Sequence, residues 1–195
     1  MSQLTPDDPL FEAVPEEPPS WPKVVGIISI VLGGLGLVCN GCGSAYFVIG
    51  PSFFASMMKT TVEELPPNMK PGPEMLLLSA VALVISVLLI FAGAATTRRR
   101  GSGRLMHLAY AAVQFPLFGV SMWLQWRTML QMRQWIAEHP ESPFSKGGDP
   151  MAGFVIGLVI GAVIGLAYPC FLLVWFGLIK RDAASMGRVP DRTVI

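Results

Sequence analysis

The chain has 195 residues, of which 52% are hydrophobic and only 14% are charged. Soluble domains usually contain about 25% charged residues, so this composition excludes a soluble enzyme, a disordered chain and a secreted disulfide scaffold. The net charge of +1 provides no field that would attract nucleic acid, and no nucleic-acid partner is expected. What remains is a small integral membrane protein whose main partner is the lipid bilayer.

The apolar residues fall into four long blocks, at about residues 24–47, 75–97, 105–126 and 151–179. Each block exceeds the roughly 18 apolar residues that mark a transmembrane helix. None contains Asp, Glu, Lys or Arg. The alternating segments of about ten residues that build outer-membrane barrels are absent. The pattern therefore predicts an all-α fold, in which residues 23–180 form a four-helix transmembrane bundle.

The two terminal segments differ from these blocks in composition. Residues 1–22 hold five acidic residues, six prolines and no Lys or Arg. A cleavable signal peptide would begin with basic residues, so we expect a disordered, acidic, proline-rich tail instead. Residues 181–195 are expected to form a second short tail.

Basic residues near the ends of the spans predict the orientation. Four of them crowd the connector between the second and third spans: Arg98, Arg99, Arg100 and Arg104. With Lys23 and the four basic residues after the fourth span, they make nine on this side, against five on the other. Because cytoplasmic loops are enriched in Lys and Arg, this connector and both termini are predicted to be cytoplasmic.

Two short segments remain on the opposite side, residues 51–74 and 128–150. In the first, Phe54, Met57 and Leu65 recur at helical spacing. This predicts a short amphipathic helix at the membrane surface, ended by Pro66 and Pro67. In the second, the third span is expected to continue as one helix out to His139.

The cysteines and methionines are candidates for metal or redox sites. Cys39 and Cys42 form a C-x-x-C pair, but zinc would need further ligands that the sequence does not supply. Two interpretations stay open: small buried thiols packed among glycines, or a disulfide near the outer face. Cys170 is expected to be a free core thiol. Methionines gather on the outer side, where they suit either Cu(I) binding or irregular packing. We expect no metal and no cofactor.

Polar residues inside the spans are few. His107 follows Arg104 closely and is expected at the headgroup level. Gln114 precedes Pro116 and is expected to bond a neighbouring helix or the carbonyl that the proline frees. With no nucleophile–base pair, metal set or phosphate loop, the chain is not expected to be an enzyme.

Four glycines of the fourth span recur in steps of four: Gly153, Gly157, Gly161 and Gly165. Such a register forms a groove that lets another helix approach closely. We favour packing within the bundle, against Gly33 and Gly36 of the first span. The alternative is pairing between subunits. Pro169 should kink the helix beyond the groove.

Two stretches carry a resemblance to a group of proteins: WPKVVGIISIVLGGLGL and LLIFAGAATTRRRGSGRLMHLAYA. They resemble parts of uncharacterised bacterial four-span inner-membrane proteins, which implies a bacterial inner-membrane location and no known activity. Tetraspanins are set aside because the large cysteine-rich outer loop is missing. The expected function is an accessory or scaffold subunit that acts through helix–helix association, as a homo-oligomer or with other membrane subunits. The alternative is a small oligomeric channel or transporter that uses the span-four groove.

Overall fold

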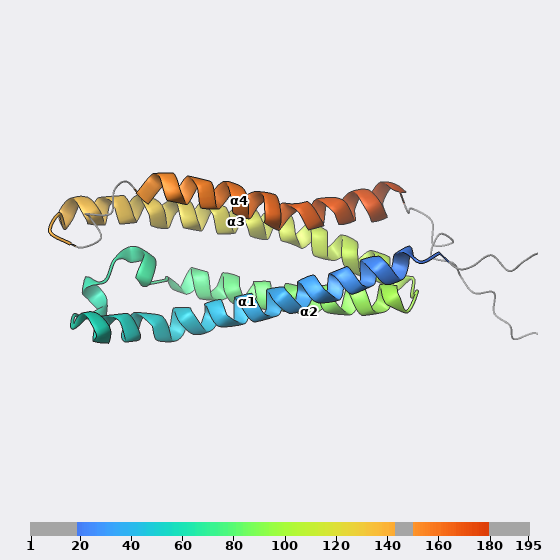
Figure 1. The fold of residues 1–195 in the computed structure, drawn as a ribbon, viewed down its shortest axis with the longest axis horizontal. Helices are drawn as coiled ribbons and strands as arrows, with labels where there is room; N and C mark the ends of the chain where they lie inside the picture. The colour runs from blue at the N-terminus through green and yellow to red at the C-terminus, as the bar shows by residue number, and fades with distance from the viewer. Residues whose placement is uncertain (1–18, 143–149, 180–195) are drawn as a thin grey trace, which may run out of the picture.

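The computed structural model describes residues 19–142 and 150–179, which form four long helices and no strand (Figure 1). The long helices are α1 (Trp21–Met58), α2 (Pro73–Thr97), α3 (Ser102–Glu138) and α4 (Pro150–Leu172). The three shorter elements are η2 (Val62–Glu64), η3 (Pro67–Met69) and η5 (Leu173–Ile179). All four long helices are apolar and long enough to cross a membrane. The all-α, four-span prediction is confirmed, and the chain is a membrane protein in contact with the lipid bilayer.

Parts of the predicted tails lie outside the described residues, namely 1–18 and 181–195. The same holds for the basic residues that follow the fourth span. At the N-terminal side, the helix begins two residues earlier than expected, with Trp21 and Pro22 in the first turn of α1. Proline suits this position because the first turn of a helix has no internal partner for its backbone N–H groups.

α1 is longer than the sequence predicted. Its 38 residues continue through Pro51 to Met58, so the expected separate surface helix does not exist. The chain then leaves α1 at Lys59, whose φ of 54° is left-handed. At 1.5 Å per residue α1 is about 57 Å long, almost twice the roughly 30 Å of a hydrocarbon core. α3 is similarly long and ends at Glu138, which confirms its predicted extension.

The fourth span changes its winding after Pro169. α4 ends at Leu172, and η5 continues it as a π-helix over seven residues. π-helical turns are wider than α-helical turns and are found where the regular hydrogen-bond ladder is disturbed. Proline removes one donor from that ladder, which accounts for the disturbance near this point.

α1 and α2 form the closest helix pair, because glycines lie where the two backbones meet. A Cβ added to Gly26 would lie 2.7 Å from the carbonyl oxygen of Gly93, and a Cβ on Gly93 would lie 2.6 Å from that of Gly26. Further along the pair, a Cβ on Gly33 would lie 2.9 Å from the carbonyl oxygen of Ser86. A Cβ on Gly36 would lie 2.8 Å from the hydroxyl oxygen of Ser86. No side chain larger than hydrogen fits at these positions, so dispersion between the two backbones holds the pair.

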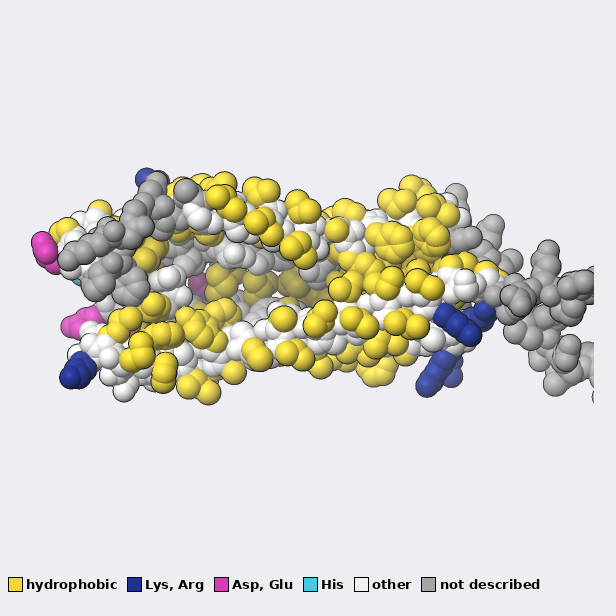
Figure 2. Space-filling view, viewed as in Figure 1, with side chains coloured by type: hydrophobic (Ala, Val, Ile, Leu, Met, Phe, Trp, Pro, Cys, Tyr) yellow, Lys and Arg dark blue, Asp and Glu magenta, His cyan; other side chains and the backbone are white. Residues whose placement is uncertain are grey.

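The molecule consists of two helix pairs, α1 with α2 and α3 with α4, that converge at one end and diverge towards the other (Figure 1). We call the converging end, which carries the connector arginines, the arginine end; the opposite end, which carries residues 59–72, is the loop end. The buried apolar core lies towards the arginine end and includes Val25, Leu89, Ala111 and Phe176. Figure 2 shows hydrophobic side chains covering the length between the two charged ends, as expected for a surface that faces lipid.

Candidate functional site

A buried polar layer joins all four helices near the arginine end. Ser29 of α1, Thr96 of α2 and His107 of α3 each have 0% of their surface exposed. The Ser29 hydroxyl lies 2.7 Å from Nε2 of His107 and 2.5 Å from the hydroxyl of Tyr168 on α4. Thr96 Oγ1 lies 3.3 Å from Nδ1 of His107. Since each helix contributes one member, this layer fixes how the two helix pairs meet.

The partners of His107 determine its tautomer. Nδ1 lies 2.7 Å from the carbonyl oxygen of Gly103, and a carbonyl oxygen can only accept a hydrogen bond. Nδ1 therefore carries a hydrogen, and in the neutral ring Nε2 can only accept. The single hydrogen of the Ser29 hydroxyl lies between two acceptors, Nε2 of His107 at 2.7 Å and the Val25 carbonyl oxygen at 2.8 Å, and the Tyr168 hydroxyl donates to Ser29 Oγ. Both ring nitrogens of His107 thus lie within hydrogen-bond distance of a partner, as burial requires.

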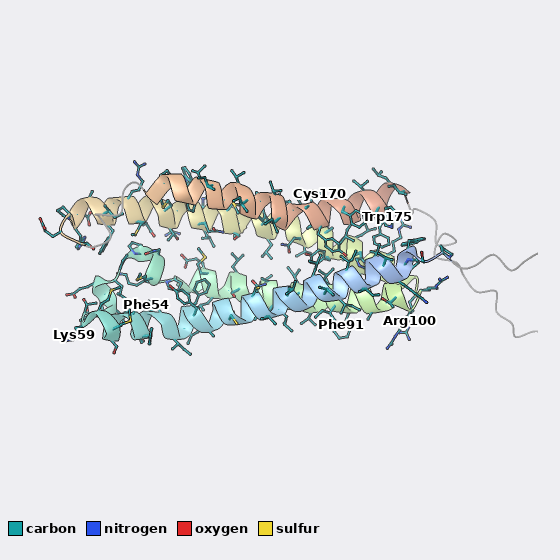
Figure 3. The ribbon with its side chains drawn as sticks, viewed as in Figure 1. Phe54, Lys59, Phe91, Arg100, Cys170 and Trp175 are labelled. Carbon is teal, nitrogen blue, oxygen red and sulfur yellow. The ribbon has the colours of Figure 1, made fainter. Side chains whose placement is uncertain are left out.

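Aromatic side chains close the arginine end beneath this layer. The ring of Phe176 stacks on His107, with centroids 4.9 Å apart, and is itself fully buried. Trp21 contacts both Phe176 and Trp175, at centroid distances of 6.0 and 5.9 Å. Figure 3 labels Trp175 in this region. Nε of Arg104 donates to the Phe176 carbonyl oxygen at 3.1 Å, which ties η5 to α3. His107 is therefore buried inside the bundle. Its depth at the headgroup level stays a prediction.

Above the polar layer, a cavity of about 570 Å³ lies between α1, α2 and α3. Its apolar wall includes Leu32, Leu78, Ile85, Leu89, Leu117 and Phe118. Its polar groups include Asn40, Ser79, Ser86, Gln114, Ser121 and Gln125. Figure 2 shows the hollow between the two helix pairs. The lining residues include no Asp, Glu, Lys, Arg or His, so the cavity is neutral and offers only hydrogen-bonding groups.

The polar groups of the cavity differ in how well they are bonded. Asn40 Nδ2 donates to the Gly36 carbonyl oxygen at 2.7 Å, and Ser86 donates to that of Ala82 at 2.8 Å. Gln125 Nε2 donates to Ser121 Oγ at 3.1 Å. Within the described part of the chain, the half-buried carboxamide of Gln114 has no hydrogen-bond partner. The expectation that Gln114 bonds a neighbouring helix or the carbonyl freed by the proline is therefore wrong.

The glycines of α4 do not pack against α1. A Cβ added to Gly153, Gly157 or Gly161 would meet nothing within 4 Å. A Cβ on Gly165 would lie 3.3 Å from the ring of Phe118 on α3. The favoured packing within the bundle is thus corrected, because α1 uses its own glycines, Gly33 among them, against α2. The physical reason is that the α3–α4 pair diverges from α1 above the polar layer (Figure 1).

The cysteines lie in continuous helices. Cys39 and Cys42 on α1 and Cys170 on α4 are all exposed and free. The expectation of thiols buried among glycines is wrong for Cys39 and Cys42, and Cys170 is free, as expected, but does not lie in the core. Among the described residues, no group of His, Cys, Asp and Glu is arranged to hold a metal ion.

Three of the connector arginines, Arg98, Arg99 and Arg100, occupy the tight turn between α2 and α3, and Arg104 lies in the first turn of α3. Arg99 has a left-handed φ of 55°, and its Nη2 donates to the Pro19 carbonyl oxygen at 2.9 Å. Gly103 permits the turn to close, because a Cβ there would lie 2.9 Å from the backbone nitrogen of Thr96. The turn thus brings Thr96 and His107 within reach of each other.

Sequence reasoning missed Ser29 and Thr96 as partners of His107, and Tyr168 as the partner of Ser29. The available signal was depth: Ser29, Thr96 and His107 each lie within about 9 Å of a basic residue at the arginine end, counted at 1.5 Å per residue. Comparison with protein-family models, with curated proteins and with solved structures gives no match for this chain. The argument for function therefore depends on the geometry described above.

Proposed function

We propose that this four-span protein is an accessory or scaffold subunit that acts through helix–helix association, with α4 as its contact surface. The proposal also assigns it to a bacterial inner membrane, with both termini and the connector arginines in the cytoplasm. The sequence resemblance supports the location, and the excess of basic residues on one side supports the orientation. On this proposal the chain is not an enzyme.

The observation that carries the proposal is the open glycine face of α4, formed by Gly153, Gly157 and Gly161. A glycine inside a helix costs about 1 kcal/mol relative to alanine, and these three have no neighbour within 4 Å. Nothing among residues 19–142 and 150–179 compensates for that cost. A helix from a second copy or from another membrane subunit would compensate for it, because glycines permit the close backbone contact that lipid cannot replace.

The arrangement of the helices supports the same conclusion. Along most of its length α4 packs on α3 alone, and its larger side chains point outwards, with Val163 66% and Ile164 72% exposed. The polar layer anchors only its lower part, through Tyr168. The upper part of α4 is thus held rigidly enough to present a face and remains accessible from the bilayer.

The test is Gly161→Leu, compared with Val163→Leu as the matched control. The leucine at 161 should block a close helix contact, so the mass of the assembly in mild detergent should fall to that of a smaller species. The thermal stability of the monomer should stay unchanged, since position 161 has open space. Val163→Leu should alter neither property. An assembly mass unchanged by Gly161→Leu would refute the proposal, and a chain that is monomeric without any substitution would exclude a second copy as the partner.

The alternative function, a small oligomeric channel or transporter, draws support from the cavity and its neutral polar groups. Two observations place it second. The aromatic closure at Phe176 blocks the arginine end, and the cavity is lined by α1, α2 and α3 without the α4 groove. Solute uptake into proteoliposomes that rises in Phe176→Ala would favour the alternative.

A further inference from the structure

We infer that the cavity between α1, α2 and α3 is a binding site for an uncharged amphipathic molecule of the bilayer that carries hydroxyl or ester groups, such as a monoacylglycerol. This inference is independent of the α4 contact surface, because no residue of α4 lines the cavity.

The size of the cavity fits a small ligand. Its volume of about 570 Å³ lies within the roughly 300–1,000 Å³ of typical ligand pockets. Such pockets have mainly apolar walls with a few polar groups that orient the ligand, and this cavity has both. The apolar side chains would contact an acyl chain, and the serine, asparagine and glutamine groups would bond the polar part.

The charge of the lining selects the chemistry of the ligand. No acidic or basic side chain lines the cavity. A phosphate or ammonium headgroup buried there would lose its hydration without gaining a counter-charge, which is strongly unfavourable. Hydroxyl and ester groups need only neutral donors and acceptors, and carboxamides and hydroxyls provide these.

Gln114 marks where the polar part of the ligand would lie. Counted at 1.5 Å per residue from Arg104, it sits about 15 Å into the span, near the middle of the bilayer. A carboxamide at that depth is costly without partners, and within the described residues Gln114 has none. The Ser86 hydroxyl, which donates to its own helix, still has acceptor capacity in the same cavity. A hydroxyl group placed between them would satisfy both.

The divergence of the two helix pairs provides the entry path. At the arginine end Trp21 and Phe176 close the bundle. Towards the loop end the pairs separate, and the hollow in Figure 2 opens at the side of the molecule. A bilayer molecule can enter there sideways, place its polar group beside Gln114 and leave its acyl chain in the opening. No passage through water is required.

The test uses a monoacylglycerol with a photoreactive group in its acyl chain, added to the full-length protein in nanodiscs. We expect saturable labelling, with adducts on peptides of α1, α2 and α3. A lysophospholipid with the same chain and a charged headgroup should label these peptides much less. Labelling that does not saturate, or equal labelling by the charged lipid, would overturn the inference.

Two substitutions locate the site, each with a matched control. Ala82→Phe fills the cavity and should abolish saturable labelling, whereas Ala80→Phe, which makes the same change on the exposed face of α2, should not. Gln114→Leu should weaken binding about fivefold, the effect of about one neutral hydrogen bond. Gln134→Leu changes an exposed carboxamide that bonds Glu138 on the same helix and should leave binding unchanged.

The unfolding transition of each variant is measured alongside its labelling. Unreduced labelling in a folded Ala82→Phe variant would contradict the site. If that variant does not fold, Gln114→Leu decides the outcome: binding equal to that of the unsubstituted chain would contradict the proposed contact.

Discussion

The close approach of α1 and α2 predicts a large effect from a very small change, Gly93→Ala. A Cβ at position 93 would lie 2.6 Å from the carbonyl oxygen of Gly26 and 2.9 Å from the Cβ of Ser29. Ordinary van der Waals contact begins near 3.4 Å, so the helices would have to separate by about 0.8 Å. Backbone atoms cannot move aside as the tip of a side chain can. Overpacking of this kind typically costs about 1–3 kcal/mol.

The same substitution at Gly157 is the control, because a Cβ there meets nothing within 4 Å. Gly157→Ala should leave the free energy of unfolding unchanged, or raise it by up to about 1 kcal/mol through helix propensity. The assay is unfolding of the purified chain in mild detergent, titrated with a denaturing detergent and followed by tryptophan fluorescence. If Gly93→Ala is as stable as the unsubstituted chain, the α1–α2 contact is not as close as described, and the reasoning fails.

The other predictions concern the polar layer, the cysteines and the loop end. His107→Leu should lower the free energy of unfolding by about 1–3 kcal/mol, because it removes the buried imidazole that links Ser29 of α1 to Thr96 of α2; an unchanged free energy would contradict the layer. Replacing Cys39 and Cys42 together by Ala should change that free energy by less than about 1.5 kcal/mol, and stoichiometric metal lost in the double variant would overturn this expectation. The Thr60 hydroxyl donates to Glu64 and holds the pKa of that carboxyl below its ordinary value of 4.5. Thr60→Val should raise the Glu64 pKa towards 4.5 in an NMR titration. In the unsubstituted chain, the order that the Thr60–Glu64 hydrogen bond gives to the loop should be lost as the pH falls through the lowered pKa of Glu64.

The spans were predictable because the bilayer imposes a simple rule. A helix that crosses it cannot tolerate charges, and the uncharged blocks ending near Lys23, Arg98 and Arg104 stand out in the sequence. The continuation of α3 beyond the third span was also predictable, since no proline follows Pro116 before His139. α1 exceeded the prediction because Pro51 is accommodated inside the helix.

The pairing of the helices was not predictable from the sequence. Side chains that face lipid and side chains that face a neighbouring helix are equally apolar, so the pattern does not reveal which face is buried. The four-residue register of Gly153, Gly157 and Gly161 predicted a close helix contact. The less regularly spaced glycines Gly26, Gly33 and Gly93 make the close contact between α1 and α2 instead. What distinguishes them is the partner surface, and only the fold provides that information.

The polar layer was missed for a related reason. Depth alone put His107 near the membrane surface. Its burial depends on the turn that packs Gly103 against Thr96 and on the η5 segment that places Phe176 over the ring. Gln114 was expected to find a protein partner, but the divergence of the helix pairs leaves it facing a cavity.

The central claim is that the helices of the two pairs pack together at the arginine end and diverge towards the loop end, where the short η3 segment contacts α3. It is tested most directly by electron paramagnetic resonance distances between spin labels on α1 and on the fourth span, α4 with its continuation η5, in a cysteine-free chain. One doubly labelled variant carries its labels at positions 23 and 178, and the other at positions 48 and 155. We predict that the distance at the loop end, between 48 and 155, is clearly longer than the distance at the arginine end, between 23 and 178. Equal distances would indicate a closed, parallel bundle in which the α4 glycines pack on α1, and would contradict the account.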